Sequence, residues 1–320
     1  MITNQKWTSI KVFSLESMTG NSNLYSNGRQ SIPVRVAIQV TDINGSPIPL
    51  SDSELKSLKL LNFHDSTAIP GPITPSSEPV DKNYSQWDWS YEAFSGFRFF
   101  PSSSRQSIAS MDGPSTKGSA HTYYIEVYLR TISPLRFTLM AQIRRDDGEL
   151  FDPGKTAHGT LLLDPVRPPT YRALNYFLEE TLIKESPRTY YYRFGLFTEG
   201  KNIEFWLFNI NPWSLLGWPD KAFLFVTVTG YTYPGEAEIR YSQRPPRNSL
   251  PWRLELTPEQ GQPVIVRVDV PVEEGDRFAN ANKYKKIAKS SIFAIDVYGN
   301  EHHTNLRFID GDAGGKIELI

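Results

Sequence analysis

Three aromatic residues, Trp87, Trp89 and Tyr91, occupy every second position in the segment SQWDWSYEAFSGFRFF, residues 85–100. Alternate side chains of a β-strand point to one face of the sheet, so the three rings would project together. Such a row can stack against the apolar faces of sugars, and Asp88 could accept hydrogen bonds from sugar hydroxyls. Burial in a core is the commoner outcome for large aromatic side chains. The segment is the first candidate ligand-binding site.

A second aromatic concentration is IEFWLFNINPWSLLGWPDKAFLF, residues 203–225. Pro212 and Pro219 predict a loop in this segment, and a loop with exposed apolar side chains would contact a protein partner or a membrane interface. Packing against the sheet of the second domain is the alternative. The candidate contact residues are Trp206, Trp213, Leu215, Leu216 and Trp218.

The sequence carries no motif of a known catalytic centre. G-x-S-x-G, G-x-x-x-x-G-K-[ST] and H-E-x-x-H are all absent. The carboxylate pairs, such as Asp146-Asp147, lie beside predicted turns or on a predicted helix, where exposure to water accounts for their charges. Two carboxylates from distant strands could still form a glycosidase site. His302 and His303 are adjacent and would face opposite sides of a strand, and neither has a spaced partner for a metal. We therefore expect no enzyme activity, no metal and no cofactor.

Composition and charge narrow the classes of partner. Lys plus Arg number 34 and Asp plus Glu number 35, so no global field would attract nucleic acid or anionic lipid. A lysine-rich run at residues 283–291 is better explained as a solvated surface. There is no cysteine, which excludes disulfides and thiolate metal sites. The N-terminus lacks the apolar core of a signal peptide, and no apolar segment is long enough for a membrane-spanning helix. A release or export route without a signal peptide remains open.

Short alternating runs recur along the chain and predict strands. They are rich in β-branched and aromatic residues and are closed by Gly, Pro, Asn or Asp. The clearest are KVFSL (11–15), VRVAIQV (34–40), YYIEVYL (123–129), RFTLMAQI (136–143), FLFVTVTGY (223–231), PVIVRVDV (263–270) and SIFAIDVYG (291–299). With 24 prolines and 21 glycines marking turns, the pattern predicts a mostly β, mainly antiparallel protein.

Two segments favour helices. SDSELKSLKLL, residues 51–61, offers Ser51 as an N-cap with Glu54 three positions later, a capping box, although LKLLNF could equally form a strand. YRALNYFLEETLIK, residues 171–184, places Leu174, Phe177 and Leu182 with Leu178 on one helical face. We expect a helix at 171–184 and one or two short helices in all.

The stretch DPVRPPT, which carries three prolines, predicts a domain boundary. We expect a first domain at residues 1–165 and a second at 166–320. The small polar residues of 102–120 predict a surface loop inside the first domain. Three segments, VAIQVTDINGSPI, TLMAQIRRDDGELF and FAIDVYGNEHHTNLRF, repeat a strand-turn-strand pattern. Shared turn chemistry or a duplicated domain would each explain the repetition.

The stretch SIPVRVAIQVTDINGSPIPL, residues 31–50, resembles the strand-turn-strand edge of bacterial immunoglobulin-like repeats of the invasin and intimin type. The matching positions are Val40, Asp42, Asn44, Gly45, Pro47 and Ile48, with isoleucine in place of the usual valine. The resemblance implies an immunoglobulin-like sandwich that acts as a spacer or binding module, and it supplies no catalytic residue. The rest of the first domain, including its tryptophan-rich segment, departs from the pattern of these repeats.

We therefore expect two antiparallel β-sandwich domains, the first immunoglobulin-like. The leading hypothesis is a non-catalytic binding or assembly protein of a bacterial or phage surface structure. It would contact protein subunits or glycans through the aromatic segments and form a homo-oligomer. The alternatives are a secreted toxin that reaches a membrane surface through the 206–218 loop, and a carbohydrate-active enzyme.

Overall fold

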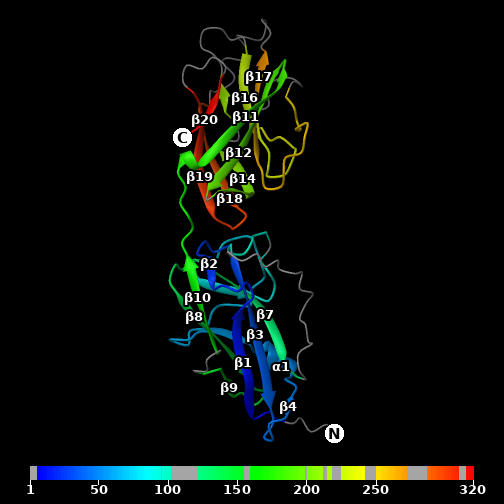
Figure 1. Ribbon diagram of the computed structural model, residues 1–320, viewed down its shortest axis with the longest axis vertical. Coiled ribbons are helices and arrows are strands. Elements are labelled where there is room, and N and C mark those ends of the chain that lie inside the picture. Colours follow the sequence, from blue (N-terminus) through cyan, green and yellow to red (C-terminus); the bar gives the residue numbers. More distant parts are fainter. Residues whose placement is uncertain are drawn as a thin grey trace. The chain divides into compact units, whose positions relative to one another are not determined.

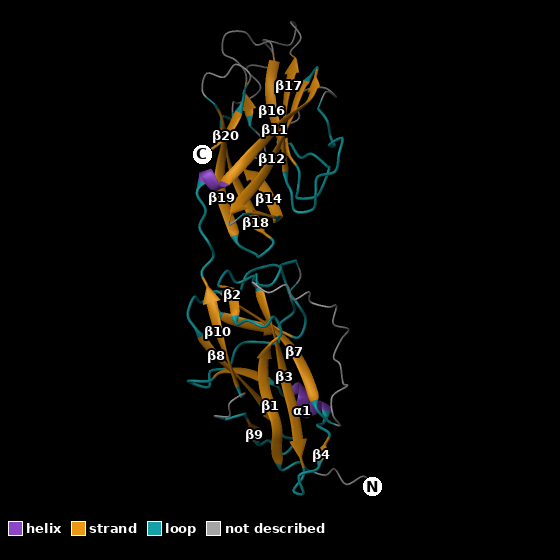
Figure 2. Cartoon of the chain, in the orientation of Figure 1, coloured by secondary structure: helices purple, strands orange, loops and turns teal. Residues whose placement is uncertain are grey.

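Strands dominate the chain, and the only helices among the described residues are one short α-helix and one 3₁₀ turn (Figure 2). The computed structural model describes residues 6–94, 96–101, 121–154, 159–198, 200–211, 215–217, 225–241, 250–271, 287–309 and 315–320. Within these ranges the protein is mostly β, as predicted. The predicted surface loop at 102–120 lies outside the described residues.

The chain divides into two compact units, Met1–Pro168 and Pro169–Ile320. The division lies inside the proline-rich stretch that predicts a boundary after residue 165. Each unit has two sheets and its own hydrophobic core (Figure 1).

The described residues of the first unit form ten strands: β1 (Ser9–Ser17), β2 (Asn23–Tyr25), β3 (Ser31–Thr41), β4 (Pro47–Ile48), β5 (Lys59–Asn62), β6 (Trp87–Ser90), β7 (Tyr123–Thr131), β8 (Phe137–Arg144), β9 (Leu150–Phe151) and β10 (Thr160–Val166). One sheet has the order β1-β3-β7-β6, with β4 paired to β3. The other has the order β2-β10-β8-β5, with β9 paired to β8. The pair of β2 and β10 is parallel, and the others are antiparallel.

Strand β3 shows how alternation builds the core of the first unit. Val34, Val36, Ile38 and Val40 occupy alternate positions and are all completely buried. They belong to one cluster with side chains of the opposite sheet, such as Leu139. A shift of register by one residue would move all four out of the core to the opposite face of the sheet, so burial fixes the pairing of β3 with its neighbours.

The helix predicted near residue 51 is confirmed as α1 (Asp52–Lys56). The Ser51 side chain accepts a hydrogen bond from the Glu54 backbone N–H, and the Glu54 carboxylate accepts one from the Ser51 N–H. This reciprocal capping box satisfies two backbone donors that the helix itself cannot. The alternative interpretation of LKLLNF is also correct, because the chain leaves the helix and enters β5.

In the part of the second unit that the structure describes there are also ten strands: β11 (Tyr176–Glu185), β12 (Arg188–Thr198), β13 (Lys201–Ile203), β14 (Phe205–Asn211), β15 (Leu216–Gly217), β16 (Phe225–Tyr231), β17 (Val264–Pro271), β18 (Lys289–Asp296), β19 (Glu301–Phe308) and β20 (Ile317–Leu319). One sheet has the order β11-β12-β17-β16-β15, with β13 paired to β12. The other has the order β14-β18-β19-β20.

The helix predicted at residues 171–184 is wrong. Only a 3₁₀ turn, η1 (Ala173–Asn175), forms there, and the rest of the segment is β11. The apolar face that suggested a helix is not buried, since Leu174 is 79% and Leu182 is 44% exposed. Instead β11 pairs with β12 along its length, and Phe177 lies directly over Gly195 of β12. Tertiary pairing thus overrides the local helical pattern.

The two units share one strand order. In each, the first, second, fifth and fourth of seven main strands form one sheet, and the third, sixth and seventh form the other. The sheets are β1-β3-β7-β6 and β5-β8-β10 in the first unit, and β11-β12-β17-β16 and β14-β18-β19 in the second. This is the strand order of the immunoglobulin sandwich. The immunoglobulin-like fold predicted for the first domain is confirmed, and the sandwich predicted for the second has the same order.

Strand β17 is buried on both faces. One face contributes Ile265 to the sandwich core, and the other packs Val266 and Val268 against Ile239 and Leu254. These last two residues belong to the long connection between β16 and β17, which covers the outer surface of the sheet. Burial on two sides explains why the run PVIVRVDV is rich in valine and isoleucine, and its two charged residues, Arg267 and Asp269, are buried as an ion pair at 2.9 Å.

The three repeated hairpin segments form the same three-residue loop. In each loop the first closing residue donates its N–H to the carbonyl of the second, and a glycine N–H donates back to the first. The closing pairs are Asp42 and Ser46, Arg145 and Glu149, and Asp296 and Asn300. The glycines have φ of +79°, +94° and +83°, the left-handed conformation that such loops require. The last two loops both follow the sixth main strand of a sandwich: one joins β8 to β9, and the other joins β18 to β19.

Candidate functional site

The row of rings expected at Trp87, Trp89 and Tyr91 is not an exposed surface. Trp87 and Trp89 are only 5% and 1% exposed. The Trp87 ring packs on Phe137 at 4.7 Å, and the Trp89 Nε1 donates to the carbonyl of Ile69 at 3.2 Å. Only Tyr91, which follows β6, is partly exposed, at 40%. The alternative interpretation, burial in the core, describes the two tryptophans.

Asp88 is also unavailable for a ligand. Its two carboxylate oxygens accept hydrogen bonds from Arg130 Nε and Nη2 at 2.8 and 3.0 Å. The Arg130 guanidinium also donates to the backbone carbonyls of Ser76 and Glu78 and lies 4.1 Å from the centre of the Phe94 ring. The segment before β6 therefore covers the outer face of the sheet, and the ion pair attaches it there. The spacing of the aromatic residues did not indicate that this segment covers the sheet.

The second aromatic segment has a mixed outcome. Trp206 is 39% exposed, but Leu215 and Leu216 are 0% and 3% exposed, so their expected exposure is wrong. Leu215 belongs to the core, and its N–H donates to the Thr229 Oγ1 at 2.7 Å. Leu216, in β15, pairs with Val228 of β16 and packs with Val226 and Val228 in a separate cluster, so both leucines are buried. Trp213 and Trp218 lie outside the described residues.

Trp206 owes its exposure to an irregularity in β14. Phe205 pairs with Asp296, but Leu207 pairs with the very next residue of β18, Ile295. Trp206 is thus an extra residue in one strand, a β-bulge, a feature that commonly redirects a side chain. Phe205 is buried in the core, while Trp206 remains accessible.

The outer face of the sheet around Trp206 is the candidate binding surface. The strand register places side chains in rows: Leu207, Ile295 and Glu301, of which Ile295 is buried at 4% exposure; then Asn209, Phe293 and His303; then Asn211, Ser291 and Asn305. Their neighbours along each strand, such as Phe208, Ile292 and Leu306, belong to the core. We call these three rows together with Trp206 the Trp206 face.

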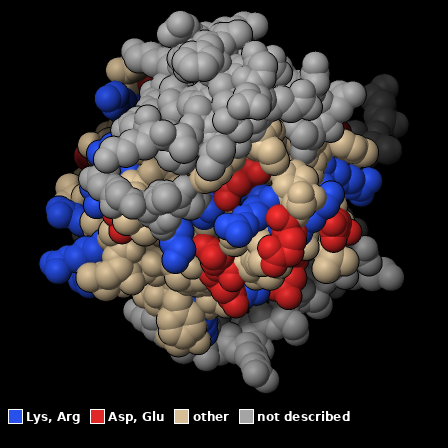
Figure 3. Space-filling view, turned by 90° about the horizontal axis from the view of Figure 1, so that it is seen from above, with Lys and Arg blue, Asp and Glu red and all other residues tan. Residues whose placement is uncertain are grey.

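The Trp206 face is polar but has little unbalanced charge. The middle row contains the Phe293 and His303 rings at a centroid distance of 5.2 Å. In the next row the Ser291 Oγ donates to the Asn305 Oδ1 at 3.1 Å. Glu301 at the margin lies 3.8 Å from the His303 Nε2. On the side of the molecule drawn in Figure 3, acidic and basic side chains of the described residues lie next to one another.

A buried network supports this sheet from its inner side. The Tyr176 hydroxyl lies 3.0 Å from the His302 Nδ1, and the His302 Nε2 lies 3.2 Å from the Asp296 Oδ2. The Tyr171 ring stacks on the His302 ring at 5.5 Å. Burial, with smaller effects of Tyr171 and Asp296, raises the pKa of Tyr176 to about 12. The network joins β11 to β18 and β19, and it confirms that His302 and His303 face opposite sides.

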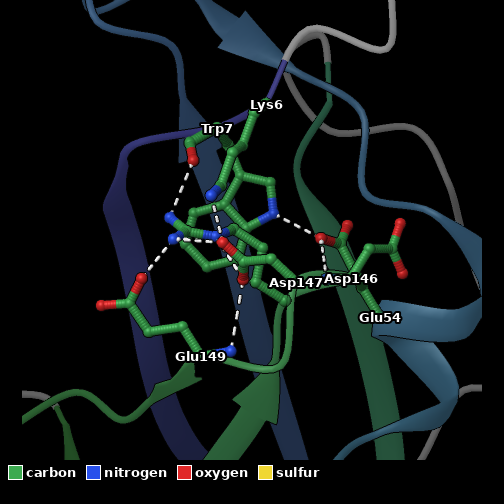
Figure 4. Close-up of polar contacts among 7 residues, drawn as sticks. Lys6, Trp7, Glu54, Asp146, Asp147 and Glu149 are labelled. Carbon is green, nitrogen blue, oxygen red and sulfur yellow. Dashed lines mark hydrogen bonds and ion pairs between the residues drawn. The ribbon is translucent and has the colours of Figure 1, made fainter.

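A second polar cluster, in the first unit, is structural (Figure 4). The Trp7 Nε1 donates to the buried Glu54 Oε1 at 2.7 Å, and Arg145 donates to the Trp7 carbonyl at 3.1 Å. Arg145, with Lys6, also holds the pKa of the Asp147 carboxyl well below its usual value. Sequence reasoning assigned the acidic pair here to solvation, but it joins the β8–β9 hairpin to the N-terminal segment and α1. The remaining members are Asp146, whose N–H donates to Glu54, and Glu149.

The strand order of the two units defines a tandem of immunoglobulin-like β-sandwiches. No family model matches the chain, and no curated protein is significantly similar to it. Among the described residues, no three His, Asp or Glu side chains gather as metal ligands, and no helix could cross a membrane.

Two solved structures show a weak similarity. The adhesin InvE of Yersinia pseudotuberculosis is 9% identical with a TM-score of 0.22, and the match covers 95% of this chain and 60% of the adhesin. Domains 5–6 of the S-layer protein SbsC are 8% identical with a TM-score of 0.21, over 92% of this chain and 96% of theirs. The chain therefore spans less than two thirds of the adhesin structure.

Proposed function

We propose that the chain is a non-catalytic binding protein that contacts its ligand through the Trp206 face. The tandem sandwiches serve as the scaffold, and the second unit presents the contact surface. The turn that resembles bacterial immunoglobulin-like repeats supports a place in a surface or extracellular structure of a bacterium or phage.

One observation carries the proposal: a tryptophan held outward by a bulge on a regular sheet. Burial of the Trp206 side chain would gain the free energy of transferring its large ring out of water. The neighbouring Phe205 does occupy the core, so the local chain is able to bury an aromatic ring. Exposed tryptophans surrounded by polar groups are frequent dominant contacts at binding surfaces.

The test compares two tryptophans of the second unit. Trp252 is 72% exposed and lies in the connection between β16 and β17, away from the β14-β18-β19 sheet in sequence and pairing. The full chain is applied to arrays of oligosaccharides and of extracellular proteins. Trp206→Ala is expected to weaken binding by roughly tenfold or more, as at a dominant contact, while Trp252→Ala leaves it unchanged.

Circular dichroism of both variants checks that they remain folded. Equal binding by wild type and folded Trp206→Ala would contradict the assignment of the site. Mass spectrometry of a bound oligosaccharide after incubation distinguishes binding from hydrolysis, and a shortened oligosaccharide would support the enzyme alternative.

A further inference from the structure

We propose that the ligand of the Trp206 face is an uncharged oligosaccharide, a step that rests on the proposed function of this face. Three properties of the described residues lead to it: the hydrogen-bonding groups of the face, its charge and its size.

The two rows beyond the bulge carry short amide and hydroxyl side chains. Asn209 accepts from the Tyr231 hydroxyl at 2.8 Å, and Asn305 accepts from Ser291, each through its Oδ1. The Nδ2 groups of both have no hydrogen-bond partner in the described part of the chain, and neither has the Asn211 amide. Each amide nitrogen carries two N–H donors. The face thus presents both donors and acceptors, and sugar hydroxyl groups can satisfy both kinds.

The same rows contain no Asp, Glu, Lys or Arg. Charged residues stand only beside these rows: Glu301 lies 3.8 Å from His303, Arg307 pairs with Glu318 at 2.6 Å, and the exposed Lys289 lies in the row after Ser291. A carboxylate or sulfate group on a ligand would find no fixed opposite charge in the rows themselves. A neutral ligand loses no ionic hydration on binding there.

The aromatic rings complete the match. Phe293 lies in the middle row between Asn209 and His303. Trp206, the bulge residue, lies at the β14 end of the face beside Leu207. Pyranose rings have apolar C–H faces and hydroxyl rims, so they can lie over a ring while their hydroxyls bond to the amides at its side. Trp and Phe rings offer flat apolar area at low cost in side-chain entropy.

The dimensions of the rows fit a short oligosaccharide. Three strands spaced about 4.8 Å apart and three rows separated by two residues each span roughly 10 Å by 14 Å. The same face continues into a further row of Lys289, Arg307 and Glu318, so a short oligosaccharide would occupy part of it.

The experiment uses the full chain, an array of neutral hexose and N-acetylhexosamine oligosaccharides, and an array of sialylated and uronate-containing ones. Asn211→Ala, at an exposed amide of the face, is matched by Asn202→Ala, at an exposed amide on β13 of the other sheet. We expect neutral oligosaccharides to bind. Trp206→Ala should weaken them by roughly tenfold or more, and Asn211→Ala by roughly threefold to tenfold, the effect of one hydrogen bond. Trp252→Ala and Asn202→Ala should bind as wild type.

Each other result has a separate meaning. Binding only to acidic oligosaccharides or to proteins, with sensitivity to Trp206→Ala, overturns the neutral ligand but leaves the proposed function standing. Binding of neutral oligosaccharides that Trp206→Ala and Asn211→Ala both leave intact overturns the site itself. The absence of neutral binding at millimolar oligosaccharide overturns the inference.

Discussion

Replacing Arg130 by methionine would expose how much the first unit depends on one buried ion pair. The Arg130 and Asp88 side chains are 3% and 10% exposed and are joined by two parallel hydrogen bonds. Methionine fills similar volume but leaves the Asp88 carboxylate buried without its partner. Removing one member of a buried pair costs about 3–5 kcal/mol.

Further contacts of Arg130 place the expected loss near the upper end of that range. Two backbone carbonyls, of Ser76 and Glu78, lose their donor, and the cation–π contact with Phe94 is worth roughly 1 kcal/mol. A loss of about 4–5 kcal/mol is a large part of the roughly 5–15 kcal/mol that stabilises an ordinary domain. The segment around residue 76 should also become more exposed to solvent exchange.

The assay is urea unfolding of the full chain, followed by tryptophan fluorescence, with hydrogen exchange to assign each transition to a unit. Arg35→Met is the control, because Arg35 forms more exposed pairs with Glu16 and Glu126 and should cost at most about 1 kcal/mol. The double variant Asp88→Leu/Arg130→Met should cost less than the two single variants added together, since no unpaired charge remains. A cost of Arg130→Met below about 1 kcal/mol, or strict additivity, would refute the reasoning.

Three further predictions concern turns, pH and packing. Asp296→Ala should destabilise the second unit by about 3 kcal/mol, because Asp296 accepts two backbone N–H bonds and two side-chain bonds; the urea midpoint measures the loss, and a loss below about 1 kcal/mol would count against it. The second unit should lose stability as pH rises from about 10 to 12, because the folded state retains the Tyr176 proton that the unfolded chain releases; unfolding at stepped pH should show a weaker dependence in Tyr176→Phe. Gly195→Ala should cost about 1–3 kcal/mol by a clash with the Phe177 ring, and the addition of Phe177→Leu should recover part of that loss in the same assay.

Much of the fold could be predicted from local patterns because strand alternation is a direct record of burial on one face. VRVAIQV became β3 with its alternate valines and isoleucine in the core, and the capping box at Ser51 and Glu54 became α1. The turn at Asp42 was predicted through Asn44 and Gly45. Its organising carboxylate was not, although Asp at the first closing position in two of the three loops was visible in the sequence.

The failures share a physical cause: exposure depends on what covers a strand. The prediction that WDWS is a strand with its rings on one face is correct. The sequence does not reveal that this face enters the sandwich core, or that a segment bonded to Arg130 through two backbone carbonyls covers the other face. YFLEETLIK has a helical apolar pattern, yet hydrogen bonding to β12 and packing of Phe177 on Gly195 make it a strand.

The candidate site depends both on local sequence patterns and on the pairing of strands in the tertiary structure. The sequence by itself determined a mostly β chain in two domains, without cysteine and with an aromatic segment around Trp206. Only the tertiary structure decided that Trp206 stays outward, because a one-residue bulge in β14 shifts its register against β18. It also brought Asn211, Ser291 and Asn305, which are far apart in the chain, into one row. Strand pairing between distant segments creates such a surface, and no local pattern encodes which segments pair.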